Sequence, residues 1–347
     1  MKRKVLIIGP ETGGIPQSIH KAFGNLGWET ELFIYGPPHM NFFQLAINRI
    51  TDPHCDTAYY YSFNEILRKR VVPLLKQGRI DILLILKGNI LDEDNKEILL
   101  KSGVPIVLWT LDSLHRAPYQ KRLADMSIGT FYVDGGDIPA EDDGNNRWLP
   151  LGYDRDVYHP GLCPCKNLDI LLIGTLGKRY TKRMQVIKRI SDSHLAQQWS
   201  CGFIGSTGTL SGNLLLYLRY GITQAGTVRW LSRRIPAEKL ARAIAGAKIC
   251  LNVLQDDGIN PVNPMFFAIP GTGTCMVAEK KPHLRHWLIA GEEYVEFEDD
   301  DVVEILDRLL SSDEEREAIA YRGQVASLNH TYESRIQTIL KRIGHAG

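Results

Sequence analysis

Short apolar runs alternate with stretches of helical periodicity along the first third of the chain. Each run is rich in β-branched residues and nearly free of polar positions, as in "KVLIIG" and "IDILLILKG". Strands of this kind are buried on both faces, which is typical of a parallel sheet covered by helices. The pattern therefore predicts a doubly wound α/β domain. Its predicted strands are 4–9, 29–36, 80–88 and 105–112, and its predicted helices are 15–27, 64–79 and 91–103.

The alternation breaks near residue 150 and then starts again. In "NRWLPLGYDRDVYHPG", Pro150, Pro160 and Gly161 interrupt the pattern, which indicates a change of domain. The second series contains a strand, a glycine turn and a helix over 168–190, strands at 202–205, 248–253 and 293–299, and helices at 236–247, 302–310, 313–328 and 332–343. We expect one α/β domain over 1–155, a second over 156–330, and a terminal helix over 331–347.

Length and charge narrow the possible functions. A chain of 347 residues exceeds the size at which a single hydrophobic core usually stops growing, so two domains are the natural expectation. Two such units bring the carboxyl ends of two sheets to a shared cleft, where open α/β sheets bind their ligands. The 41 basic and 40 acidic residues leave a net charge of +1, which provides no overall field to attract nucleic acid or anionic membrane.

Neither the apolar segments nor the cysteines indicate an exported or membrane-spanning protein. No segment approaches the ~20 apolar residues needed to cross a bilayer. The basic and then apolar start, "MKRKVLIIGP", is too short for a signal peptide and predicts the first strand. Scattered cysteines fit reduced thiols and a cytoplasmic location, and the close pair Cys163 and Cys165 lacks the second half of a zinc site. The six cysteines lie at positions 55, 163, 165, 201, 250 and 275.

A glycine turn rich in cations follows the first strand of the second series. Gly174 and Gly177 frame the turn in "IGTLGKRYTKR", and four cations crowd the helix that follows it. Cations at a helix N-terminus oppose the helix dipole unless an anion binds nearby. The alternative is a solvated basic helix face, and the local sequence leaves both open. The four cations are Lys178, Arg179, Lys182 and Arg183.

A second glycine turn lies in "NPMFFAIPGTGTCMVAE", just before a short buried strand. Gly271 and Gly273 allow unusual torsions and close approach, while Thr272 and Thr274 offer hydroxyl and N–H donors. Such a turn can hold an anion or can simply connect two elements. We expect this turn at the same end of the sheet as the first one, and two donor-rich turns at one end favour a diphosphate cradle.

Two common nucleotide-binding motifs are absent. The sequence "GTLGKRYT" lacks the spacing of the lysine-containing P-loop, and "GPETGG" after the first strand has the wrong glycines for the dinucleotide fingerprint. These absences argue against a P-loop ATPase and against an oxidoreductase or sugar-nucleotide epimerase that binds a dinucleotide.

Several segments, in order, resemble the CgeB-like, spore-maturation type glycosyltransferases. They are "DILLIGTLGKRYTKR", "AKICLNV", "NPVNPMFFAIPGTGTCMVAEKKPHLRHWLIAGEEYVEF", "EREAIAYRGQ" and "HTYESRIQTIL", with a looser match in "LLKSGVPIVLWTLDS" and "WLPLGYDRDVYHP". The resemblance is specific over residues 168–340 and weak before residue 105. It implies a GT-B fold, in which two Rossmann-like domains face each other across an interdomain cleft and the terminal helix packs back toward the first domain.

The resemblance also implies the activity and the roles of individual residues. A sugar would pass from a nucleoside diphosphate sugar, with a UDP-sugar favoured, to an unknown saccharide, small-molecule or protein acceptor held by the N-terminal domain. No cofactor is expected beyond this co-substrate. The donor-binding residues expected on this basis are Gly174, Thr175, Gly177, Lys178, Arg183, Asn263, Phe267, Gly271, Thr272, Gly273 and Thr274.

Two positions depart from the pattern of the family. Where relatives have arginine and an acid that binds ribose hydroxyls, this chain has Met265 and Ala268. Loss of a charge-assisted hydrogen bond costs about 1.5–3 kcal/mol, or roughly ten- to a hundredfold in affinity. An unusual donor, a different nucleotide contact, and a fold retained for binding without catalysis are therefore all open.

Three residues of the first domain are candidate general bases. Asp112 follows a buried strand in "PIVLWTLDSLHR", and its carboxylate could deprotonate an acceptor hydroxyl if the reaction inverts the anomeric centre. Its alternative role is to cap the next helix. Glu11 follows the first strand, and His20 lies on the helix after it, where a lone histidine is more often a surface or core residue.

No metal site is expected. The acid run "FEDDDVVEILD" fits a polar loop and a helix N-terminus, where negative charge suits the dipole. We expect metal-independent chemistry, in which lysine, arginine and helix N-termini neutralise the diphosphate leaving group.

Overall fold

The computed structural model describes residues 2–11, 13–35, 57–88, 91–114, 120–139, 147–175, 181–205, 229–231, 235–254, 258–298 and 300–345. The chain forms two compact units. The first comprises Met1–Pro150 together with Arg335–Gly347, and the second comprises Leu151–Ser334. The division after Pro150 lies five residues before the domain end expected at 155, and the chain returns to the first unit four residues after the helix boundary expected at 331.

The first unit is built on a parallel sheet of six strands in the order β2-β1-β3-β4-β5-β6. Direct pairing of β1 with β3 continues from Val5↔Ile82 to Ile8↔Ile85, and all four residues of β4 are buried. Burial on both faces explains the unbroken apolar runs. The strands are β1 (Lys4–Pro10), β2 (Glu29–Tyr35), β3 (Ile82–Leu86), β4 (Ile106–Trp109), β5 (Gly129–Tyr132) and β6 (Arg147–Trp148).

Helices cover both faces of this sheet. Crossovers between parallel strands are right-handed, so α1, which leads back to β2, lies on the face opposite to the helices that lead forward. Leu67, Leu99 and Leu123, from three successive forward helices, share one core cluster with β1, β3 and β4. The helices of this unit are α1 (Ile15–Asn25), α3 (Thr57–Lys76), α4 (Glu93–Lys101), α5 (Gln120–Met126) and most of α12 (Tyr332–Arg342).

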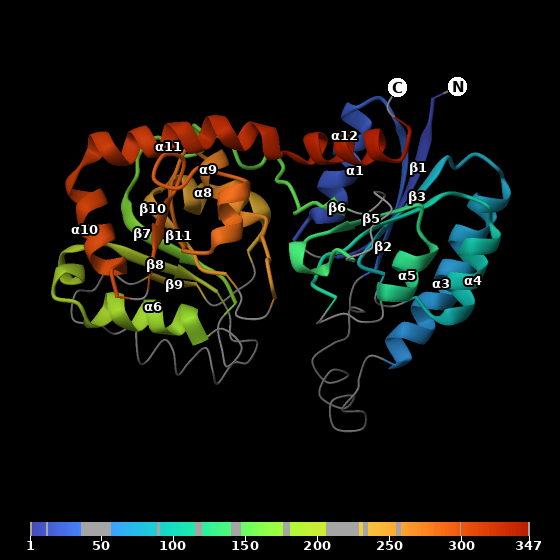
Figure 1. The fold of residues 1–347 in the computed structure, drawn as a ribbon, viewed down its shortest axis with the longest axis horizontal. Helices are drawn as coiled ribbons and strands as arrows, with labels where there is room; N and C mark the ends of the chain where they lie inside the picture. The colour runs from blue at the N-terminus through green and yellow to red at the C-terminus, as the bar shows by residue number, and fades with distance from the viewer. Residues whose placement is uncertain are drawn as a thin grey trace. The chain divides into compact units, whose positions relative to one another are not determined.

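The terminal helix α12 is fixed to the first unit by polar and aromatic contacts. Arg335 is buried and donates from Nε to the carbonyl of Pro150 at 2.9 Å. Burial lowers the pKa of this guanidinium to about 9. The ring of His345, beyond the end of α12, lies 6.4 Å from the ring of Trp28, and Figure 1 shows α12 in red next to the blue α1.

The second unit is also built on a six-stranded parallel sheet, in the order β12-β11-β10-β7-β8-β9. Its strands are β7 (Leu168–Ile173), β8 (Cys201–Ile204), β9 (Arg229–Leu231), β10 (Ala247–Asn252), β11 (Cys275–Glu279) and β12 (Val295–Phe297). Its helices are α6 (Thr181–Asp192), α8 (Ala237–Ala245), α9 (Met265–Gly271), α10 (Val302–Ser311) and α11 (Asp313–Ser327). Two separate parallel sheets with helical crossovers confirm the predicted fold class.

One helix of the second unit was not predicted. The apolar residues of "MFFAIPG" form α9 instead of packing in irregular chain against the turn. The side chain of Asn263 accepts a hydrogen bond from the backbone N–H of Phe266, which satisfies one donor of the first turn. Pro270 near the end of this short helix hid it, because proline usually argues against a helix interior.

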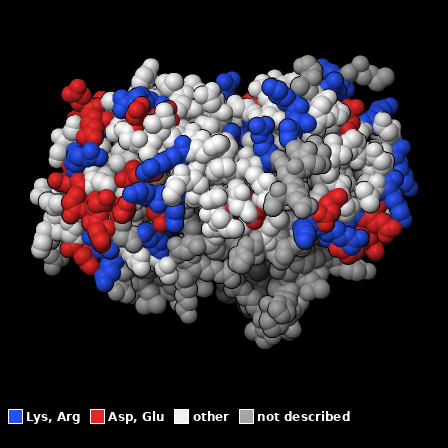
Figure 2. Space-filling model, viewed as in Figure 1, with Lys and Arg blue, Asp and Glu red and all other residues white. Residues whose placement is uncertain are grey.

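Charge on the described surface is mixed. Figure 2 shows lysine and arginine side chains interspersed with aspartate and glutamate over the described part of the face drawn, in keeping with the net charge of +1. In the part of the chain that the structure describes, no helix is long and apolar enough to span a membrane.

Candidate functional site

The carboxyl ends of the second sheet gather several candidate residues at one edge. All pairs in this sheet are parallel, so the ends of neighbouring strands meet there. Gly174 follows β7, Asn252 ends β10, Glu279 ends β11 and Phe297 ends β12. Ligands of open parallel sheets bind at this edge, and we call these residues and their neighbours the carboxyl edge of the second sheet.

Arg183 joins two loops of this edge. Its Nε donates to the carbonyl of Val253 at 2.9 Å, and its Nη1 donates to the carbonyl of Thr175 at 2.8 Å. Val253 follows β10 and Thr175 follows β7, which are neighbouring strands. The guanidinium is therefore buried beneath the edge, with its charge held against two loop carbonyls.

The glycine at position 174 is required by this arrangement. A Cβ there would lie 2.7 Å from Cζ of Arg183, and the residue has a φ of 151°, which side chains disfavour. The backbone of Gly174 thus lies directly on the guanidinium. Of the other predicted residues in this turn, Gly177 and Lys178, with Arg179 beside them, lie outside the described residues.

Two asparagines connect the edge to α9. Nδ2 of Asn263 donates to Oδ1 of Asn252 at 2.8 Å, while Oδ1 of Asn263 accepts from the N–H of Phe266 at 3.0 Å. Asn252 is buried at the end of β10. The predicted residue Asn263 therefore belongs to the carboxyl edge, as Gly174, Thr175 and Arg183 do.

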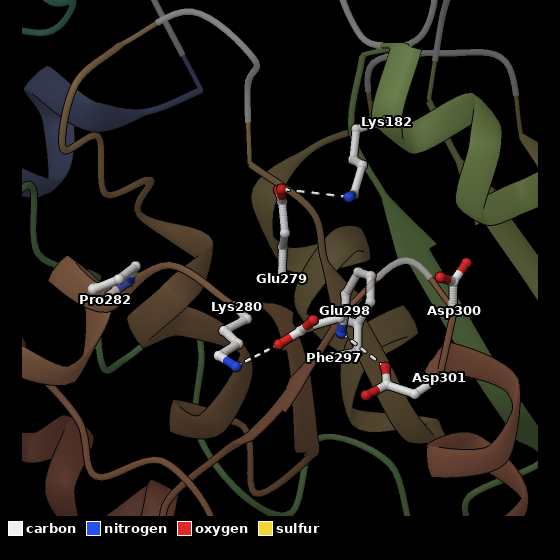
Figure 3. Close-up of a pocket in the computed structure, with 8 residues that line it drawn as sticks. All are labelled: Lys182, Glu279, Lys280, Pro282, Phe297, Glu298, Asp300 and Asp301. Atoms are coloured by element: carbon white, nitrogen blue, oxygen red, sulfur yellow. Dashed lines mark hydrogen bonds and ion pairs between the residues drawn. The ribbon is translucent and has the colours of Figure 1, made fainter.

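A hollow of about 480 Å³ opens at this edge beside the end of β11. Glu279 projects from the strand end toward Lys182 on α6, with 3.8 Å between Oε1 and Nζ (Figure 3). Lys281 approaches the same oxygen at 3.2 Å. The Glu279 side chain is only 10% exposed, so two lysines flank a nearly buried carboxylate that borders the hollow. The hollow is lined by Lys182, Glu279, Lys280, Pro282, Phe297, Glu298, Asp300 and Asp301.

The rim of the hollow is held by its own polar contacts. Lys280 forms an ion pair with Glu298, and Oδ1 of Asp301 accepts from the N–H of Glu298 at 2.7 Å (Figure 3). Sequence reasoning missed Glu279. The available signal was an acid that ends the apolar run "CMVA" and precedes two lysines, because the last residue of a buried parallel strand reaches the ligand-binding edge.

The turn at Gly271–Thr274 lies at the other end of the sheet. It precedes β11, whereas the Gly174 turn follows β7, and β11 and β7 both pair parallel with β10. The structure therefore corrects the expectation that both turns share one end. Oγ1 of Thr274 donates to the carbonyl of Ile244 at 2.9 Å. Oγ1 of Thr272 lies 2.8 Å from the carbonyl oxygen of Ile269 in α9 and 3.0 Å from Oγ1 of Thr274.

The two glycines of this turn serve packing and conformation. A Cβ on Gly271 would lie 2.6 Å from Cε2 of Tyr153, so α9 packs against that ring through the glycine. Gly273 has a φ of 75°, and its carbonyl accepts a hydrogen bond from Nζ of Lys166 at 2.9 Å. Together with the bonded threonines, these contacts give Gly271, Thr272, Gly273 and Thr274 an internal structural role.

Phe267 lies in an aromatic cluster within the second unit. It is fully buried, stacks on His330 with a centroid distance of 4.4 Å, and meets Trp287 edge-on at 6.2 Å. Contacts of this kind are typical of a core residue. The side chain of Phe267 is therefore occupied by packing within the second unit.

The candidate bases of the first unit have different surroundings. Asp112 follows β4 and pairs with Lys87, which follows β3, with 2.6 Å between Oδ2 and Nζ. Glu11 follows β1 and is exposed. Because β3 lies between β1 and β4, the ends that carry Glu11 and Asp112 are roughly 10 Å apart. His20 lies in the second turn of α1, and its Nδ1 is buried without a hydrogen-bond partner among the described residues.

No cluster of three or more metal-binding side chains is present in the described ranges. His115 and Arg116, which follow Asp112 in the sequence, lie outside those ranges.

Comparison with known proteins agrees with this architecture. Residues 206–341 match the family model described as "Glycosyl transferase-like". Sucrose-phosphate synthase from Thermosynechococcus elongatus is similar over 100% of both chains, with a TM-score of 0.68 and 10% identity. The chain has the GT-B fold. No protein of curated function matches it significantly in sequence.

Two further GT-B structures are similar along nearly the whole chain. Anabaena Alr3699/HepE in complex with UDP-glucose has a TM-score of 0.65 and 13% identity, and covers 98% of this chain and 99% of its own. An α,α-trehalose-phosphate synthase (UDP-forming) from Burkholderia vietnamiensis has a TM-score of 0.63 and 13% identity, and covers 99% of this chain and 97% of its own. The glycosyl transferase-like segment lies almost wholly in the second unit of the GT-B fold.

Proposed function

We propose that this protein is a glycosyltransferase that uses a UDP-sugar donor bound at the carboxyl edge of the second sheet. The observation that carries the proposal is the match of residues 206–341 to a glycosyl transferase-like family, on the unit whose carboxyl edge holds the hollow and its charged residues. The motifs around Gly174 and Asn263 further favour the CgeB-like type within that group. The similar structures of Anabaena Alr3699/HepE, one with UDP-glucose and one with UDP and glucose, support a uridine nucleotide.

Individual residues of the edge have distinct proposed roles. The backbone N–H of Thr175 faces the diphosphate, whereas the N–H of Gly174 belongs to the sheet and donates to the carbonyl of Ile204 at 2.9 Å. Arg183 stabilises the diphosphate charge from beneath the turn while fixing the loops after β7 and β10. Glu279 accepts hydrogen bonds from hydroxyl groups of the UDP-sugar, a role that suits a carboxylate at the wall of a polar hollow. Lys182 keeps that carboxylate oriented.

The first unit holds the acceptor, and Asp112 is the proposed general base. The carboxylate takes the proton from an acceptor hydroxyl as its oxygen forms a bond to the anomeric carbon of the donor. The bond between that carbon and the diphosphate oxygen breaks, and UDP leaves with the electron pair. This displacement inverts the anomeric centre. Asp112 is preferred to Glu11 because its carboxylate is held by an ion pair at 2.6 Å, while Glu11 is exposed.

A binding protein without turnover is the second candidate. Met265 and Ala268 replace the arginine and the acid of relatives, and Ala268 is fully buried in α9. Each of the two lost polar contacts would lower the affinity for a nucleotide-sugar donor by roughly ten- to a hundredfold. Glu279 offers another carboxylate for the sugar donor at the carboxyl edge, which supports donor binding by either candidate.

The decisive experiment measures binding and turnover over a panel of nucleotides. Calorimetry with UDP, ADP, GDP and CDP should give the tightest binding for UDP, and UDP should be released from at least one UDP-sugar with water or a sugar acceptor. Binding of UDP-sugars without release of UDP would favour the binding protein. Absence of binding to every nucleoside diphosphate would refute both candidates.

A further inference from the structure

Lys87 has a backbone conformation that lysine normally avoids. Among the described residues it is the one non-glycine residue with a positive φ, at 66°. Residues other than glycine are strained there, and such strain persists at functional sites where the surroundings enforce it. Lys87 comes directly after β3, at the carboxyl edge of the first sheet.

The turn around Lys87 is fixed by a buried hydroxyl group. The N–H of Gly88 donates to the carbonyl of Leu86 at 2.8 Å, which closes a three-residue γ-turn with Lys87 at its centre. The hydroxyl of Tyr35, which is 4% exposed, donates to the same carbonyl and accepts from the N–H of Gly88, both at 3.2 Å. The N–H of Lys87 donates to the carbonyl of Trp109 at 3.1 Å, which ties the turn to β4.

This turn directs the lysine to one partner. Nζ of Lys87 lies 2.6 Å from Oδ2 of Asp112, and each side chain is 27% exposed. An ion pair with this exposure contributes little to folding, so it does not account for the retained strain. Glycine would adopt the same φ without strain. A lysine here is therefore explained better by what its ammonium group does to Asp112 than by the fold.

We propose that Lys87 is a positioning residue for Asp112, a role that rests on the proposed glycosyl transfer. The strained turn holds the ammonium group so that its hydrogen bond fixes the carboxylate at the carboxyl edge of the first sheet. Asp112 removes the proton of the acceptor hydroxyl as the new bond to the anomeric carbon forms and UDP leaves. Lys87 itself neither gains nor loses a proton in this step.

The test compares Lys87→Gly with the wild-type protein. Relief of strain should keep the melting temperature within about 2 °C of wild type or raise it. The Kd for UDP should stay within about twofold, because the proposed donor site lies in the other unit. The kcat for UDP release from the UDP-sugar that is turned over should fall by roughly ten- to a hundredfold, as expected for a misplaced catalytic group.

Four further variants make the result specific. Lys87→Arg keeps a cation and should recover part of kcat. Tyr35→Phe removes the hydroxyl group that fixes the turn around Lys87, and should lower kcat although Lys87 and Asp112 are both present. Lys87→Gly should have no further effect in an Asp112→Asn background, since both changes act through one carboxylate. Lys248→Gln is the matched control, because its ion pair with Asp169 at 2.7 Å lies at the amino edge of the second sheet. It should leave kcat unchanged.

Each contrary outcome has one meaning. Wild-type kcat in a folded Lys87→Gly protein overturns the positioning role and leaves the glycosyltransferase proposal intact. Unfolding of Lys87→Gly also overturns it, because the lysine would then serve the fold. Additive losses in the double variant contradict action through Asp112. If the wild-type protein binds no UDP and releases none from any UDP-sugar, the proposed function fails and the role of Lys87 fails with it.

Discussion

Two glycine-threonine turns in the second unit have similar composition and opposite positions. The turn at Gly174 and Thr175 follows a parallel strand, lies on a buried guanidinium and opens onto the carboxyl edge. The turn at Gly271–Thr274 precedes a parallel strand, and its hydroxyl groups bond within the protein. The direction of the adjoining strand, and not the residue content of a turn, decides which one can meet a ligand.

The largest difference between the two turns is expected in a matched pair of alanine variants. A Cβ at Gly174 would lie 2.7 Å from the guanidinium of Arg183, and a Cβ at Gly271 would lie 2.6 Å from the ring of Tyr153. Overpacking of this kind costs about 1–3 kcal/mol of stability in either case. Only Gly174→Ala should also lower the affinity for UDP, by roughly ten- to a hundredfold, because it displaces Arg183.

Chemical denaturation and calorimetry on the same preparations separate the two effects. Equal loss of UDP affinity in both variants would mean that the distinction between the two turns has no bearing on the donor.

A second pair of variants tests the edge itself. Glu279→Gln removes the carboxylate between Lys182 and Lys281. It should lower the affinity for a UDP-sugar by roughly tenfold. Glu296→Gln is the control, because that side chain, on the neighbouring strand β12, is also 10% exposed and pairs with Arg285, which lies between β11 and β12. It should lower stability and leave affinity unchanged. Reduced affinity for the UDP-sugar in both variants would indicate a general effect of removing a negative charge.

A smaller effect is expected at Gly273. Its φ of 75° disfavours any side chain, although a Cβ would meet nothing closer than Pro160 at 3.6 Å. Gly273→Ala should therefore cost about 1–2 kcal/mol, the penalty of the left-handed conformation. UDP affinity, measured by calorimetry on folded protein, should equal that of wild type. A selective loss of affinity would return this turn to the donor site.

The smallest expected effect concerns acid stability at the amino edge of the second sheet. Burial raises the pKa of Asp169, but hydrogen bonds from Lys248 and Ser200 outweigh it and hold the pKa below its ordinary value of 3.8. A depressed pKa stabilises the fold above the ordinary value, and this contribution is lost as pH falls through the folded value. Asp169→Asn should be less stable than wild type at neutral pH, with the difference shrinking near pH 3. A constant difference across thermal melts at several pH values would contradict this.

The sequence predicted most elements of both sheets because buried parallel strands leave continuous apolar runs. The run "DILLILKG" and the helix "DEEREAIAYRGQVASL" appear in the structure as β3 and α11, within a few residues at each end. The helix α9 was missed because Pro270 and two glycines resemble irregular chain. Its side-chain cap at Asn263 is a local contact that composition does not reveal.

The candidate site was less predictable, since it depends on which end of each strand a residue occupies. The composition of residues 271–274, two glycines and two threonines, predicted a ligand-binding turn. In the structure the hydroxyl of Thr274 instead bonds to the carbonyl of Ile244, 30 residues away in the sequence. Glu279 was overlooked because a single acid after an apolar run has no motif. Its two lysine partners become neighbours only once α6 and β11 fold against one sheet edge.

Amide hydrogen exchange of the wild-type protein, with and without UDP, locates the site of UDP binding without any substitution. We predict that UDP slows exchange in segments 173–175, 253–254 and 279–281, at the carboxyl edge of the second sheet, and leaves 272–275 unchanged. Slower exchange confined to 272–275, with no change after β7 and β11, would contradict it.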